Sequence, residues 1–314
     1  MNSSHQRAAV AIATLLILFL PTLAAAAAPQ GKAYTTPEAA VEAFVGAVRG
    51  YDLKTLLAIL GEESERLFVS EDPTADQNQR QEFLRLYDER QELVSSDAET
   101  KVLVVGADSW PLPIPLVKSG TGWAFDAEAG LDEIINRRVG RNELSAIQTC
   151  LAVGDAQREY FRRDRDGDGI LEYARKFRST IGLRDGLYWP VEAGDPQSPI
   201  GEFVATASDE GYGPEDTAYH GYRYKFLTSQ GPAANGGAYD YLARDNQIGG
   251  FAIVAFPASY GDSGIMTFLM SHEGIVYQKD LGENTDREVH NMASFNPEAW
   301  AKVDEKDTQP LTEP

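Results

Sequence analysis

The chain has 314 residues, of which 43% are hydrophobic, so it is long enough to form two modest domains with apolar cores. Its 28 Lys and Arg residues stand against 48 Asp and Glu residues, and the resulting charge of −20 argues against nucleic acids and anionic membrane surfaces as partners. The single cysteine, Cys150, excludes an intramolecular disulfide, and we expect it to be a small buried side chain rather than a nucleophile.

Residues 1–28 have the pattern of a secretory signal peptide. Arg7 supplies the positive n-region, residues 8–20 form an apolar h-region, and a run of small residues ends near Ala28. A transmembrane anchor fits less well because the apolar core is short and ends at Pro21. The sequence therefore predicts a periplasmic or secreted protein without a transmembrane anchor. Cleavage near Pro29 would also remove Arg7 and make the mature chain one charge more negative.

The next segment, residues 29–140, is predicted to be an α+β domain that begins with helices. Thr35-Thr36-Pro37-Glu38 combines a capping residue, a first-turn proline and an early glutamate, which together favour a helix start. A second, short helix is expected to stop at Gly61. A third helix is predicted over residues 76–94.

The apolar pattern then changes to that of a short antiparallel meander. Its predicted strands cover residues 101–106, 114–119 and 122–126. Alternating prolines between residues 110 and 116 rule out a central strand. We expect an edge segment with Trp110 and Leu112 in the core; an exposed docking segment is the alternative.

The chain is organised around a long amphipathic helix that starts at Asn142 and runs into an acidic loop. Leu144, Ile147 and Leu151 recur at the spacing of one helical face. Asn142 is expected to cap this helix, and Gly140 to separate it from a preceding helix at residues 128–138. A glycine inside a helix costs about 1 kcal/mol relative to alanine, so we expect a backbone or a large ring close to Gly154.

The acidic loop has the D-x-D-x-D-G spacing that begins an EF-hand calcium loop. Gly169 would permit the sharp turn, but Arg175 takes the place of the usual bidentate glutamate, so a full EF-hand is excluded. A truncated calcium loop and a solvated acidic turn both remain open. The candidate metal ligands are Asp164, Asp166, Asp168 and Glu172, with the carbonyl oxygen of Ile170.

The remaining residues, 141–296, are predicted to form a domain in which this helix packs on an antiparallel sheet. Tyr173–Ser179 is expected to continue as a helical turn. Residues 181–218 are rich in Gly, Pro, Asp and Ser, and we expect a long ordered loop of the kind that is often functional. Residues 297–314 are polar and expected to be a disordered tail. The predicted strands are 219–228, 237–242, 249–256, 264–270 and 274–279.

Several stretches together resemble the bacterial family known as domain of unknown function 2950. They include TPEAAVEAF, DSWPLPIPLV, GWAFDAEAG, INRRVGRNELSAIQ, SPIGEFVA, QGPAANGGAYDY and GGFAIVAFPASYG. The resemblance spans almost the whole mature chain. It implies an exported bacterial protein without an assigned activity, and it carries over no catalytic residues.

The second half also resembles, in part, the globular domain of type IV pilins. In those proteins a long helix beginning near an N-E-x-x-A run packs on an antiparallel sheet, and GGFAIVAFP and TFLMSHEGIVY are similar to strands of that sheet. The prepilin cleavage motif is absent, and the helix lies in the middle of the chain. The resemblance implies a fold and not filament assembly.

One short motif raises the question of catalysis. Gly261-Asp262-Ser263-Gly264 matches the nucleophile signature of trypsin-like proteases, but the histidines at 220, 272 and 290 lack that family's context. The same four residues also make an ordinary turn between strands. No His/Cys cluster suits zinc.

We therefore expect an exported envelope protein that is not an enzyme. It would bind or scaffold an envelope protein or a small ligand, with calcium stabilising the acidic loop. The alternative is a periplasmic hydrolase or small-ligand enzyme with its pocket near residues 181–218. A pocket with convergent histidine or carboxyl groups would favour the enzyme, and an apolar or flat surface would favour binding.

Overall fold

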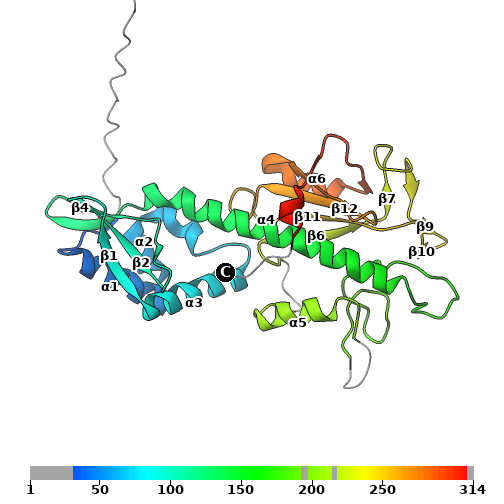
Figure 1. Ribbon diagram of the computed structural model, residues 1–314, viewed down its shortest axis with the longest axis horizontal. Helices are drawn as coiled ribbons and strands as arrows, with labels where there is room; N and C mark the ends of the chain where they lie inside the picture. Colours follow the sequence, from blue (N-terminus) through cyan, green and yellow to red (C-terminus); the bar gives the residue numbers. More distant parts are fainter. Residues whose placement is uncertain (1–30, 192–196, 214–217, 310–314) are drawn as a thin grey trace, which may run out of the picture.

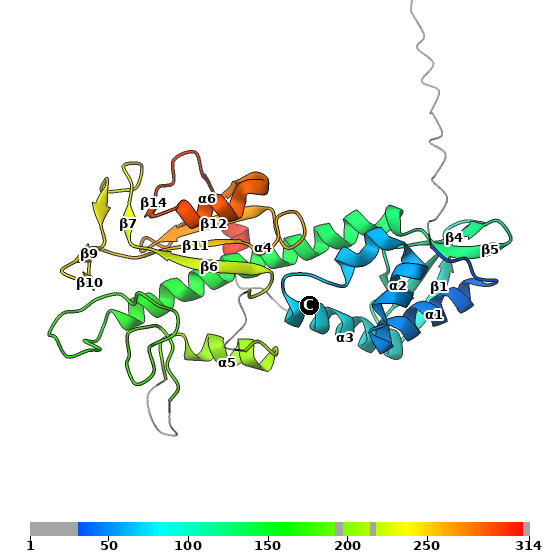
Figure 2. The same ribbon diagram turned by 180° about the vertical axis from the view of Figure 1, so that it is seen from behind.

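The computed structural model describes residues 31–191, 197–213 and 218–309, and the predicted α+β architecture is confirmed. Two lobes lie at opposite ends of one long helix, α4 (Ala127–Tyr160) (Figures 1 and 2). The predicted signal peptide lies outside the described residues. Among the residues that are described, no helix combines the length and the apolarity that crossing a membrane requires.

The N-terminal lobe packs three helices against a five-stranded antiparallel sheet. Side chains of Thr36 and Asp72 cap α1 and α3 by accepting hydrogen bonds from backbone N–H groups of the first turn. The sheet has the order β1-β2-β4-β5, with β3 paired to β2. Its elements are α1 (Pro37–Gly50), α2 (Leu53–Leu60), η1 (Glu62–Leu67), α3 (Pro73–Glu89), β1 (Gln91–Ser95), β2 (Thr100–Val105), β3 (Trp110–Pro111), β4 (Leu116–Ser119) and β5 (Gly122–Phe125).

Two expectations in this lobe are corrected. The third helix ends at Glu89, and the following residues form β1 because they pair with β2 over its whole length. The proline-rich segment is an edge as expected, and Leu112 is buried. Trp110, in contrast, is 37% exposed, because its ring lies on the outside beneath the Arg137 guanidinium, 5.4 Å from the ring centroid.

Helix α4 is continuous for 34 residues and passes through Gly140, so the predicted break at this residue is wrong. Asp126 caps the helix, whereas Asn142 is buried within it and donates a hydrogen bond to the Ser263 carbonyl oxygen, 2.9 Å. A single exposed glycine costs about 1 kcal/mol, which burial of the apolar faces on either side offsets. The predicted domain boundary between residues 140 and 141 therefore falls inside a helix that both lobes share. The expectation of a backbone or a large ring close to Gly154 is also wrong, because the nearest neighbour is the flexible side chain of Met270.

The C-terminal lobe has three layers, with an antiparallel sheet of order β15-β13-β12-β11-β6 between two helical layers. Alternate side chains of β6, Tyr222, Tyr224 and Phe226, share a core with α4 on one face. On the other face, Leu227 shares a core with Val289 of α6. The strands of this sheet are β6 (Tyr222–Leu227), β11 (Ala252–Pro257), β12 (Met266–Ser271), β13 (Val276–Asp280) and β15 (Ala301–Lys302).

Shorter elements surround this sheet. Strands β7, β8 and β14 form a small sheet of their own, and β9 pairs with β10 near the end of α4. Helix α5 runs beside α4 in both views (Figures 1 and 2). These elements are α5 (Gly201–Asp209), β7 (Ser229–Gln230), β8 (Tyr239–Asp240), β9 (Leu242–Ala243), β10 (Asn246–Gln247), η2 (Gly282–Asn284), α6 (Thr285–Asn291), β14 (Ser294–Phe295) and η3 (Glu305–Thr308).

Three expectations differ from the structure here. Residues 173–179 form no helical turn: they are irregular, with bends at Arg175 and Phe177, and Arg178 forms a bridge with Tyr188. The expected long loop at 181–218 contains α5. Part of the expected disordered tail is ordered, since β15 pairs with β13 and the Gln148 side chain hydrogen-bonds the carbonyl oxygens of Asp307 and Gln309.

The two lobes also meet away from α4, at the loop that precedes α3. Buried Asp72 accepts hydrogen bonds from the Tyr212 hydroxyl (2.9 Å) and the Gly221 N–H (2.8 Å), both in the C-terminal lobe. The Asn78 amide donates to the Glu210 carbonyl oxygen at 2.8 Å. The N-terminal lobe thereby holds Glu210, Tyr212 and Gly221 in place.

Candidate functional site

The acidic loop after α4 brings three of the predicted metal ligands together. Carboxylate oxygens of Asp164, Asp166 and Asp168 lie within 4.8 Å of one another, and all three side chains are exposed. Asp164 accepts from the N–H groups of Gly167 (2.7 Å) and Gly169 (2.9 Å). Both glycines have positive φ, 84° and 85°, so the loop bends where side chains are least tolerated.

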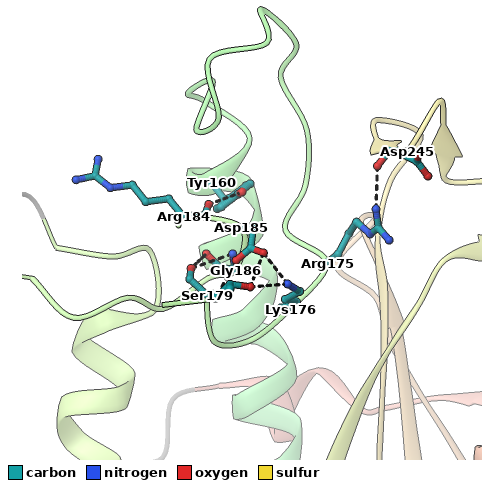
Figure 3. A network of polar contacts seen from close by, with 9 residues as sticks. Tyr160, Arg175, Lys176, Ser179, Arg184, Asp185, Gly186 and Asp245 are labelled. Atoms are coloured by element: carbon teal, nitrogen blue, oxygen red, sulfur yellow. Dashed lines mark hydrogen bonds and ion pairs between the residues drawn. The ribbon is translucent and has the colours of Figure 1, made fainter. Parts of the chain in front are cut away.

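The same loop docks on strand β10. Asn246 donates to Asp168 at 2.6 Å, and Glu172 accepts from the Gln247 N–H at 3.2 Å. The Arg175 side chain donates to the Asp245 carbonyl oxygen at 2.9 Å (Figure 3). The hairpin β9–β10 therefore orients one carboxylate of the cluster, Asp168, and the adjacent Glu172.

Electrostatics in the loop differ between its carboxylates. Burial raises the pKa of Glu172, and the negative charges of Asp166 and Asp168 raise it further, against the hydrogen bond from Gln247. Hydrogen bonds from the backbone of Gly169 and Gly167 lower the pKa of Asp164. Like charges so close together repel, and a hard cation with several oxygen ligands would relieve that repulsion. Of the predicted carboxylate ligands, Glu172 lies outside this group of three aspartates. At Ile170, the backbone N–H donates a hydrogen bond to Asp168 at 2.7 Å.

A cavity of about 420 Å³ lies between α4, α5 and the edge strand β6. Val153 of α4, Tyr224 of β6 and Phe203 and Val204 of α5 supply apolar walls. Among the described residues that line it, Arg178 is the only charged side chain, and no carboxylate or imidazole is present. The cavity touches the segment 181–218, where the sequence predicted a functional loop.

The wall formed by residues 176–188 is a hydrogen-bonded ladder. The N–H groups of Ser179 and Tyr188 donate to the carbonyl oxygens of Tyr188 and Phe177, at 2.8 Å each. Asp185 fixes the bend of the ladder. It accepts hydrogen bonds from Lys176 (Figure 3) and from the backbone N–H and the hydroxyl of Thr180. Although burial opposes them, these hydrogen bonds lower the pKa of Asp185 to about 2.

A second wall is held by the N-terminal lobe. Tyr212 and Tyr219 line the cavity, and their rings pack edge to face with centroids 4.8 Å apart. The Tyr212 hydroxyl donates to Asp72, and the Tyr219 hydroxyl donates to Glu210 at 3.2 Å. His220 lies 3.1 Å from the same Glu210 carboxylate. The polar tips of both tyrosines are therefore occupied, and their rings face the cavity.

The serine of the GDSG motif is built into a turn. Ser263 is 2% exposed, its hydroxyl donates to the Ser259 carbonyl oxygen at 3.0 Å, and it accepts from the Ser259 N–H at 2.9 Å. In the described part of the chain no histidine hydrogen-bonds Ser263. The hydroxyl thus lacks both the access and the base that a nucleophile needs.

Sequence reasoning missed most of the cavity because its walls come from separate segments. The available signal in the sequence is the presence of aromatic residues such as Tyr188 and Tyr212 in a segment that is otherwise rich in Gly, Pro, Asp and Ser. Thr149 and Val153 look like ordinary helix positions in the sequence, and only the docking of α5 beside α4 turns them into a lining.

Comparison with known proteins agrees with the resemblance found in the sequence. No curated protein and no solved structure matches the chain, so the likeness to pilin globular domains stays a prediction. The model of one family, described as protein of unknown function (DUF2950), matches residues 31–303, which include both lobes, the acidic loop and the cavity. The chain therefore belongs to the DUF2950 family.

Proposed function

We propose that this protein is an exported, non-enzymatic binding protein that holds a small, mainly apolar ligand in the cavity between α4, α5 and β6. The observation that carries the proposal is the lining, which is rich in aromatic and aliphatic side chains and contains no carboxylate or imidazole among its described residues. Its volume falls within the range of roughly 300–1,000 Å³ that is typical of small-molecule sites. Acid–base catalysis most often uses a histidine or a carboxylate, and the described part of the lining contains neither.

The acidic loop completes the proposal as a calcium site that stabilises the end of α4. Asp164, Asp166 and Asp168 supply oxygens at the required spacing, and Glu172 with the Ile170 carbonyl would complete the set. The loop follows the C-terminus of α4, where the helix dipole disfavours negative charge. A bound cation would relieve both the repulsion between the carboxylates and their unfavourable interaction with the helix dipole. A dissociation constant of about 0.1–1 mM would suffice outside the cytoplasm.

Ligand binding is tested with N-phenyl-1-naphthylamine, a neutral apolar probe whose fluorescence rises in an apolar site. We expect saturable binding to the wild type and its loss in Ala207→Trp, which fills the cavity from α5. Ala205→Trp is the matched control, because Ala205 lies on the same helix but is exposed and does not line the cavity. Equal affinity of Ala207→Trp and Ala205→Trp for the probe would mean that the probe binds outside the cavity, which would refute the proposed site.

The calcium site is tested by thermal unfolding of the mature chain in calcium or in chelator. Calcium at a hundredfold excess over its dissociation constant should add about 2.7 kcal/mol of stability. The double variant Asp166→Asn with Asp168→Asn should lose this response, and magnesium should replace calcium poorly because it demands a tighter octahedral shell. A wild-type midpoint that ignores the chelator would mean that the loop is a solvated turn.

A further inference from the structure

Arg178 is the charged residue among the described residues that line the cavity, and no described residue pairs with its charge. Its guanidinium lies over the Tyr188 ring, 4.9 Å from the centroid, and it forms no ion pair and no side-chain hydrogen bond with any described residue. Its neighbours in sequence are engaged: Lys176 pairs with Asp185 at 2.6 Å, and Arg175 donates to the Asp245 carbonyl oxygen at 2.9 Å. Among the described residues that line the cavity, Arg178 is therefore the basic group that remains available to a ligand.

The backbone fixes where this side chain starts. Residues 178 and 188 are joined by a bridge, in which the Ser179 N–H donates to the Tyr188 carbonyl oxygen at 2.8 Å. The contact between Gly186 and the Arg178 backbone is so close that a Cβ at 186 would meet the Arg178 carbonyl carbon at 2.7 Å. Arg178 and Tyr188 thus form one unit at the exposed side of the cavity, with the ring restricting the guanidinium.

The local charge around this unit differs from that of the whole chain. Residues 155–185 contain eight basic and seven acidic side chains, whereas the full chain carries a charge of −20. This segment is therefore nearly neutral and repels an anion less than the charge of the whole chain would suggest. A guanidinium presents a planar fork of N–H donors that matches the two oxygens of a carboxylate, phosphate or sulfonate group.

We propose that the ligand of the cavity is an amphipathic anion, with an apolar body against the aromatic walls and its anionic group on Arg178. This inference rests on the proposed function, because it names the chemistry of the ligand that the cavity would hold. The aromatic and aliphatic walls account for the body, and the unpaired guanidinium beside Tyr188 accounts for the head. A neutral amphiphile of the same length would leave the Arg178 guanidinium without a counter-charge, and a cationic one would be repelled by it.

The test compares two probes that share one aromatic skeleton. N-phenyl-1-naphthylamine is neutral, and 1-anilinonaphthalene-8-sulfonate carries a sulfonate. We expect the wild type to bind the sulfonate probe more tightly than the neutral probe. Arg178→Gln should weaken the affinity for the sulfonate probe about tenfold and the affinity for the neutral probe much less. Arg175→Gln is the matched control, since Arg175 is also exposed but does not line the cavity, and it should change neither affinity.

Competition for the bound sulfonate then identifies the head group. Dodecanoate and dodecyl phosphate should displace the probe, and dodecanol and dodecylammonium should do so at least tenfold less effectively. The relative strength of the two anions distinguishes a carboxylate from a phosphate ligand. The difference in affinity between the anionic and the uncharged amphiphiles should decrease as the salt concentration is raised, because the Arg178 contact is partly exposed to solvent.

The outcomes separate the two proposals. If neither probe binds, or if Ala207→Trp binds both, the proposed function itself fails. If the neutral probe binds in the cavity but Arg178→Gln weakens both probes equally, or Arg175→Gln has the same effect as Arg178→Gln, the function stands and the anionic head group is refuted.

Discussion

Asp72 is the residue through which the N-terminal lobe supports a wall of the cavity, and its removal should be costly. The Asp72→Ala variant loses the cap of α3, in which Asp72 accepts from the Ala75 N–H at 2.9 Å, at a cost of about 1 kcal/mol. It also leaves the buried donors Tyr212 hydroxyl and Gly221 N–H without their acceptor, at about 1–3 kcal/mol each. We expect a total loss of about 3–7 kcal/mol.

The matched control is Asp52→Ala. Asp52 caps α2 by accepting from the Thr55 N–H at 3.1 Å, but it is exposed and has no partner in the other lobe among the described residues. This variant should lose only about 1 kcal/mol. Urea unfolding of the mature chain, followed by tryptophan fluorescence and circular dichroism, gives both free energies. In thermal unfolding the difference amounts to roughly 2–4 °C for each kcal/mol.

Equal losses in the two variants would refute the reasoning, because they would mean that Asp72 contributes no more than a helix cap. If Asp72→Ala does not fold, Tyr212→Phe tests the same link with a smaller change, since Asp72 keeps its bonds to Ala75 and Gly221. Tyr212→Phe should also weaken binding of the neutral probe, because the ring that lines the cavity loses its anchor.

Three further outcomes are expected. Ser263→Ala should destabilise the 259–264 turn by about 1–3 kcal/mol without lowering any hydrolytic activity, and covalent labelling of Ser263 by a fluorophosphonate would instead revive the protease hypothesis. Burial raises the pKa of the Cys150 thiol from its ordinary value of 9.0 to about 12, so iodoacetamide at pH 8.5 should modify Cys150 only in urea. Because the thiol ionises more readily in the unfolded chain, the free energy of unfolding should fall as the pH rises from about 9 to about 12, and less so in Cys150→Ala. N-terminal sequencing of the exported protein should find a start near Pro29, and an intact Met1 on a membrane-bound chain would contradict export.

The sequence by itself determined the features that depend on neighbouring residues. Hydrogen bonds between residues close in sequence set all three of the following features: the cap at Thr36, the two strands that flank the turn at Gly120 and the acidic loop. The same local patterns carried the family resemblance, which the match over residues 31–303 bears out. Short-range hydrogen bonds and periodicity are legible in a sequence because their partners are adjacent in the chain.

Only the tertiary structure decided the features that depend on distant partners. Gly140 does not end its helix, and Asn142 is no cap, because burial against the Ser263 turn keeps the helix continuous. The cavity exists because α5 lies beside α4 and β6, and the aromatic ring of Tyr212 lines it because Asp72 holds the hydroxyl from 140 residues away. The long-range packing that fixes these positions has no local signature, so the sequence could indicate the loop but not its walls.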